Sequence, residues 1–100
     1  MNMIHLHFQD GFQDDEIVVS AGSRELWRGA GISTDLRISR ARVAEIEIEE
    51  PQSELRITLP KRGISTLISV DAAAAPFVGV SVGSSRELEI RFSPSDFDYF

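Results

Sequence analysis

The fold class is decided by the segment VAEIEIEEP, residues 43–51, and the segment SELRITLP, residues 53–60, which follows it after Gln52. Apolar residues alternate with charged or polar residues through both segments. Because successive side chains of a strand point to opposite faces of a sheet, this pattern is typical of two strands, each with one buried face. The break at 51–53 predicts a short loop, and the two segments are expected to pair as an antiparallel hairpin.

The rest of the chain contains further short segments of the same kind, separated by polar and glycine-containing turns. In the first of them, alternation predicts that Ile4, Leu6 and Phe8 face the core. The alanine-rich segment 71–76 is too short to hold a helix by itself, so a single helical turn or an irregular crossover is expected there. The additional predicted strands cover residues 3–9, 16–21, 24–28, 32–39, 64–70, 77–82 and 87–92.

About eight or nine short strands with turns between them predict an all-β fold. We expect a single antiparallel β-sandwich, immunoglobulin-like or jelly-roll-like in layout, with no long helix. The length of 100 residues corresponds to one domain, residues 1–100, which is large enough to bury a core without a metal or a disulfide.

The composition excludes several classes of function. The chain has no cysteine, which rules out disulfides, thiolate zinc sites and cysteine nucleophiles. The net charge of −6 disfavours binding to nucleic acid. No apolar run approaches the roughly 20 residues needed to span a membrane, and no secretory signal is visible, so a cytoplasmic protein without a membrane partner is expected.

Two histidines form the first candidate metal site. His5 and His7 lie two residues apart in a predicted strand and therefore share one face, opposite the core residues. Two imidazoles in this position could ligate one metal ion. The alternative interpretation is that both histidines face solvent on an outer strand, since the chain has no third histidine to complete a cupin-like set.

An acidic loop forms the second candidate metal site. Asp10, Asp14, Asp15 and Glu16 gather around a glycine turn, and calcium prefers carboxylate and loop carbonyl oxygens. The stretch lacks the regular spacing of an EF-hand loop. Its alternative interpretation is a solvated acidic loop.

Four aromatic residues are candidates for binding a partner. Trp27 is the only tryptophan, and Phe97, Tyr99 and Phe100 lie in a tail that is too aromatic for a free linker. Exposed aromatic rings would anchor a protein or stack on a sugar. If Trp27 instead fills the core, the sugar-binding hypothesis loses its best anchor.

A row of glutamates, including Glu45 and Glu47, lines the exposed face of the 43–60 segments. Paired carboxylates can perform acid–base chemistry on sugars. Like charges along an exposed strand are more typical of protection against edge-to-edge aggregation.

The sequence contains no recognisable catalytic constellation, so an enzyme ranks third among the hypotheses. The leading hypothesis is a small non-catalytic β-sandwich that acts through protein–protein interaction or self-assembly. Removal of residues 96–100 is expected to weaken that interaction. The alternative is a ligand-binding module for carbohydrate, assisted by calcium, in which Trp27 or Tyr99 is exposed beside the acidic loop.

Overall fold

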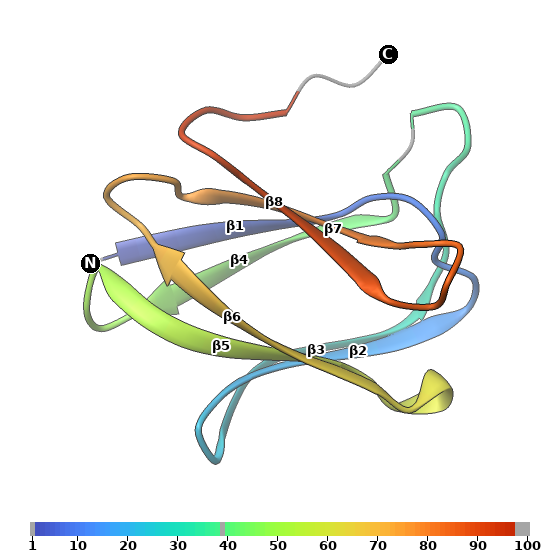
Figure 1. The fold of residues 1–100 in the computed structure, drawn as a ribbon, viewed down its shortest axis with the longest axis horizontal. Coiled ribbons are helices and arrows are strands. Elements are labelled where there is room, and N and C mark those ends of the chain that lie inside the picture. The colour runs from blue at the N-terminus through green and yellow to red at the C-terminus, as the bar shows by residue number, and fades with distance from the viewer. Residues whose placement is uncertain (1, 39, 98–100) are drawn as a thin grey trace.

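The computed structural model describes residues 2–38 and 40–97 and has two four-stranded sheets packed face to face (Figure 1). Sheet A has the strand order β4-β1-β7-β8, and sheet B has the order β3-β2-β5-β6. The predicted all-β sandwich is therefore confirmed. The strands are β1 (Asn2–Phe8), β2 (Asp15–Ala21), β3 (Arg24–Ile32), β4 (Arg42–Ile48), β5 (Gln52–Leu59), β6 (Ile64–Asp71), β7 (Phe77–Val82) and β8 (Leu88–Ser93), with a 3-10 turn, η1 (Pro60–Arg62), between β5 and β6.

The core lies between the sheets and follows the alternation of the sequence. The predicted inward residues of β1, Ile4, Leu6 and Phe8, are completely buried. Burying large apolar side chains of this kind contributes roughly 1.5–3 kcal/mol each to folding. The other strands add residues at every second position, among them Ile17, Val19, Ala44, Ile46, Ile48, Leu55, Ile57, Leu59, Ile68, Val70, Val78 and Val80.

The N-terminal strand lies in the middle of sheet A. It pairs antiparallel with β4 on one side and parallel with β7 on the other, where His5 lies opposite Phe77 and Phe8 opposite Val80. All other neighbouring strands are antiparallel. A parallel pair requires a long connection, and here that connection contains β2 to β6.

The predicted hairpin between residues 43–50 and 53–60 is wrong. β4 pairs with β1 in sheet A, whereas β5 pairs with β2 and β6 in sheet B, so the turn at Pro51 carries the chain from one sheet to the other. Both strands still bury their apolar residues because each of the two sheets turns one face to the core. Alternation specifies which residues are buried and leaves the pairing partner open.

The third and fourth predicted strands also differ from the structure. β3 continues through Gly29 to Ile32, because the absent side chain at Gly29 makes room for Trp27; a Cβ there would lie 2.6 Å from the indole ring. Residues 33–38 form a loop with a turn at 36–38 instead of a strand. The Asp35 carboxylate accepts a hydrogen bond from the Arg37 amide at 3.0 Å, which is the local side-chain bonding that favours turns.

The alanine-rich connection between β6 and β7 is a single turn, closed by a 2.8 Å hydrogen bond from the Ala75 amide to the Asp71 carbonyl, which matches the expected single helical turn. The Asp71 carboxylate accepts hydrogen bonds from the amides of Ala73 and Ala74 at 3.0 and 3.1 Å, which fixes the chain as it leaves β6. Within residues 2–38 and 40–97, no helix has the length and apolar character needed to cross a membrane.

Candidate interaction surfaces

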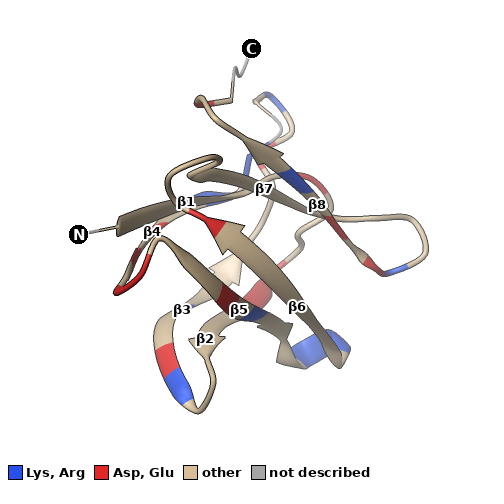
Figure 2. Ribbon diagram, turned by 60° about the vertical axis from the view of Figure 1, so that its left-hand side comes forward, with Lys and Arg blue, Asp and Glu red and all other residues tan. Residues whose placement is uncertain are grey.

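The open edge of sheet B is β6, a strand without a charged residue from Ile64 to Val70 (Figure 2). On its outer face Leu67 is 51% exposed and lies between Ser65 and Ser69. The Ala72 amide donates to the Pro51 carbonyl at 2.7 Å, so the even-numbered residues of β6 are the ones bonded to β5. Because antiparallel bonding alternates, the odd-numbered residues of β6 direct their peptide groups away from β5. Such an uncharged edge is a template for another strand.

The open edge of sheet A on the same side of the sandwich is β8. The Gly83 amide donates to the Glu87 carbonyl at 2.8 Å, so the odd-numbered residues of this strand bond to β7. The peptide groups of Leu88, Ile90 and Phe92 therefore point along the open edge. Their side chains lie on the core side of the sheet, where the edge position leaves Phe92 49% exposed.

The outer face of β8 is charged, with Glu89 and Arg91 two residues apart (Figure 2). The Arg91 guanidinium donates to the Gln9 side-chain oxygen at 3.1 Å and lies 5.1 Å from the centre of the Phe97 ring. Gly79, next to Arg91 in the sheet, has no side chain, and the Gln9 amide occupies that space. These contacts hold Arg91 over sheet A.

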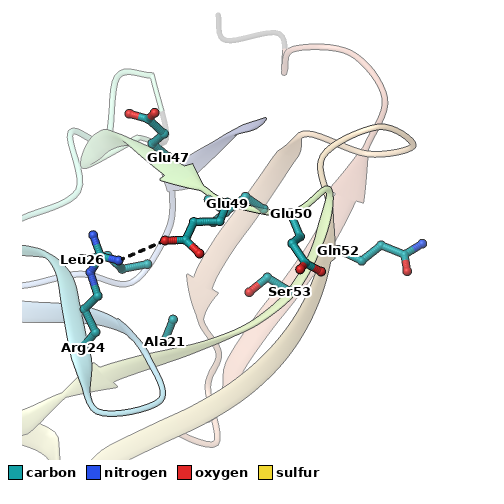
Figure 3. Close-up of a pocket in the computed structure, with 9 residues that line it drawn as sticks. Ala21, Arg24, Leu26, Glu47, Glu49, Glu50, Gln52 and Ser53 are labelled. Atoms are coloured by element: carbon teal, nitrogen blue, oxygen red, sulfur yellow. Dashed lines mark ion pairs between the residues drawn. The ribbon is translucent and has the colours of Figure 1, made fainter. Parts of the chain in front are cut away.

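On the opposite side of the sandwich, the β2–β3 turn and the β4–β5 corner form an open groove of about 780 Å³ (Figure 3). Glu47, Glu49 and Glu50 line it from the corner. Arg24 reaches across from the turn, with 3.7 Å between its Nη1 atom and the Glu49 Oε1 atom. Both side chains are largely exposed, so this ion pair contributes little to stability. The acidic residues outnumber the basic one, and the groove favours positive charge.

The acidic loop does not gather its carboxylates around one point. Asp15 is buried and accepts two hydrogen bonds of 2.8 Å from the Arg62 guanidinium. Burial alone would raise the pKa of Asp15, but the bonds from Arg62 and from the Gln13 amide hold that pKa below its usual value. Glu16 pairs with Arg28 at 2.9 Å, while Asp10 and Asp14 are exposed.

The two histidines have different environments. His5 stacks on Phe77 with 4.7 Å between ring centres. His7 is only 4% exposed, because the chain after β8 folds back and places Asp96 3.3 Å from its Nε2 atom and the Phe97 ring 5.2 Å from the imidazole. The interpretation of two solvent-facing histidines is therefore wrong for His7.

The pKa of His7 lies below its ordinary value of 6.5. Burial is the largest cause, since it disfavours the charged imidazolium; Arg40 and His5 act in the same direction. The Asp96 carboxylate opposes them and raises the pKa. His7 is accordingly neutral at neutral pH.

Within residues 2–38 and 40–97, no group of three or more histidine, aspartate or glutamate side chains is arranged to hold a metal ion. Both metal hypotheses, calcium at the acidic loop and a metal at His5 and His7, stay predictions.

The predicted aromatic residues do not form one surface. Trp27 is partly buried against the core and stacks on Phe8 with 5.5 Å between ring centres, which is the core position considered as its alternative. Phe97 packs on the outer face of sheet A, and Tyr99 and Phe100 lie outside the described residues.

The sequence interpretation missed the β6 and β8 edges. A signal was present for the first, because residues 64–70 contain no charge, no proline and no glycine. Recognising β8 as an edge requires the strand order, which only the structure supplies. No protein-family model, curated protein or solved structure matches this chain.

Proposed function

We propose that this protein is a non-catalytic interaction domain that binds an extended, uncharged segment of another protein along β6. The observation that carries this proposal is the charge-free edge from Ile64 to Val70, with Leu67 half-exposed at its centre. Strand addition uses main-chain hydrogen bonds for affinity and side-chain contacts for specificity. Each main-chain bond contributes about 1 kcal/mol, so a segment of six or seven residues is sufficient for weak, reversible binding.

The ends of the strand support this function. η1 precedes β6, and its Arg62 is tied to the buried Asp15, while Asp71 caps the turn that follows. Both ends of the edge are therefore fixed before a partner arrives. A preformed strand loses less conformational entropy on binding than a flexible one.

The test uses a labelled peptide with the sequence of residues 64–70 between solubilising lysines, because that sequence is itself uncharged and favours a strand. Paired antiparallel, its leucine lies opposite Leu67. Fluorescence anisotropy is expected to show saturable binding. Hydrogen exchange is expected to slow at the amides of Ser65, Leu67 and Ser69, the residues whose peptide groups face the edge.

Leu67→Lys places a charge in this edge and is expected to weaken peptide binding at least tenfold, since a strand added there must bury part of the ammonium. Leu36→Lys, the same change at a leucine that is 88% exposed in the turn after β3, is the matched control and should leave binding unchanged. Equal loss in both variants, or protection of amides outside β6, would contradict the proposal. Thermal melts of both variants establish that the fold is retained.

A further inference from the structure

We infer that β8 is a self-association edge, which pairs antiparallel with β8 of a second copy of this chain about a two-fold axis at Ile90. This inference concerns a different edge from the proposed binding of a partner at β6 and does not rest on it. Its basis is the arrangement of five consecutive residues, Leu88 to Phe92, on the last strand of sheet A.

The main-chain geometry permits this axis. The peptide group of Ile90 points along the open edge, as do those of Leu88 and Phe92. With the axis at Ile90, each Ile90 pairs with its counterpart, and each Leu88 pairs with Phe92 of the second copy. All three positions are then hydrogen-bonded pairs, so every outward peptide group of the segment finds a partner.

The charges select this register. Pairing about Ile90 places Glu89 opposite Arg91 of the second copy twice, at non-hydrogen-bonded positions where side chains approach most closely. Shifting the axis to Glu89 would bring two carboxylates together. Shifting it to Arg91 would bring two guanidinium groups together. Within residues 88–92, the axis at Ile90 is the one that pairs opposite charges and brings no like charges together.

The apolar face is complementary as well. Phe92 points to the core side of sheet A but is 49% exposed, because no strand of sheet A lies beyond β8 in the described chain. In the dimer, Leu88 of the second copy lies beside it on the same face. The edge that exposes Phe92 is thus covered by an apolar residue of the same five-residue segment.

β4, at the opposite edge of sheet A, cannot pair with its own copy in this way. In β4, the residues around Ile46 are Glu45 and Glu47, both exposed. An antiparallel pairing centred on any of these three positions brings glutamate opposite glutamate. Because an isologous contact uses the same patch on both copies, pairing through β8 alone closes at two chains.

The test is sedimentation velocity from micromolar to millimolar concentration, with Glu89→Arg, Arg91→Glu and the double variant. The unmodified chain is expected to dimerise. Either single change sets like charges opposite each other and should raise the dissociation constant at least tenfold. The double variant exchanges the charges and should restore dimerisation.

A mixture of the two single variants gives the sharpest result. The Glu89→Arg chain carries two guanidinium groups, and the Arg91→Glu chain carries two carboxylates, so the two are expected to form a heterodimer although neither associates with itself. Glu87→Arg, an equal charge change just before β8, is the control and should leave the dimer intact.

Arg91→Glu also removes the contacts of Arg91 with Gln9 and Phe97, but the double variant lacks the same contacts. Restored association in that variant therefore assigns the effect to charge pairing. A chain that stays monomeric at millimolar concentration would overturn the inference. So would a dimer that is abolished by Leu67→Lys and untouched by Glu89→Arg.

Discussion

The two edges of sheet A differ by one charge at corresponding positions. β4 presents Glu45-Ile46-Glu47, and β8 presents Glu89-Ile90-Arg91, with the isoleucine directed toward the core in each. In β4 the charges repel a second copy in every alignment centred on these residues. In β8 one alignment is complementary. The sign of a single side chain can therefore decide whether a sheet edge repels a second copy or is complementary to it.

The asymmetry extends to the whole sandwich. The side formed by β3 and β4 carries the acidic groove and the Arg24–Glu49 ion pair (Figure 3). The side formed by β6 and β8 carries the half-exposed side chains Leu67 and Phe92. Both edges proposed for association therefore lie on one side of the molecule.

The largest effect is expected from Arg62→Ala, because Arg62 ties η1 to the start of β2 and so stabilises the sheet that carries the β6 edge. The substitution leaves the buried Asp15 carboxylate without its guanidinium partner. We expect a loss of about 3 kcal/mol in the free energy of unfolding, measured by urea denaturation. Lys61→Ala, which affects the neighbouring exposed pair with Asp14, should cost less than about 1 kcal/mol.

The Asp15–Arg62 pair predicts how the free energy of unfolding depends on pH. The pKa of Asp15 is lowered in the folded protein, so the unfolded chain binds a proton more readily. The stability contributed by this carboxylate is present above about pH 4 and is lost as the pH falls through the folded-state pKa. Equal acid sensitivity of the unmodified chain and Arg62→Ala would contradict this assignment.

A smaller effect is expected from Glu47→Arg, which gives β4 the charge pattern of β8. In this variant both edges of sheet A can pair with a second copy, so sheet A should extend into open-ended assemblies instead of a closed dimer. Light scattering at increasing concentration measures this change. Adding Glu89→Arg to this variant disables β8 and should return the assembly to a dimer formed through β4. Stability should change by no more than about 0.5 kcal/mol, because position 47 is exposed.

The smallest effect concerns the segment that covers sheet A between its two edges. Asp96 is the group that raises the pKa of His7, so Asp96→Asn should lower that pKa further. The measurement is an NMR titration of the His7 imidazole. Glu50→Gln, at the β4–β5 corner, is the control and should leave the titration unchanged.

For His7, as for Asp15, the contribution to stability decreases as the pH falls. Because its folded-state pKa is lower than 6.5, the stability associated with neutral His7 is present above about pH 6.5 and is lost as the pH falls below that value. Unchanged stability between pH 7 and the acid transition would show that His7 burial does not depend on its charge.

The sequence predicted the features that depend on local alternation. Ile4, Leu6 and Phe8 were identified as core because strand periodicity alone determines the buried face. The hairpin at Pro51 was misassigned because alternation is the same for two strands in one sheet and two strands in opposing sheets. The strand predicted at 32–39 failed because Asp35 bonds to the nearby Arg37 amide and forms a turn.

The candidate surfaces were less accessible to sequence reasoning. The burial of His7 depends on Asp96 and Phe97, which lie at the other end of the chain. The complementarity of residues 88–92 is visible in the sequence, but it matters only for a strand at a sheet edge. Strand order depends on long-range pairing, which local patterns do not encode.

The parallel pairing of β1 with β7 also determines when this protein can fold during its synthesis. His5 must wait for Phe77, so sheet A stays incomplete until most of the chain has left the ribosome. Closing the long loop between β1 and β7 slows folding. Sheet A is therefore completed after these strands have been translated. Until then sheet A lacks β7 and β8, and one side of β1 has no neighbouring strand.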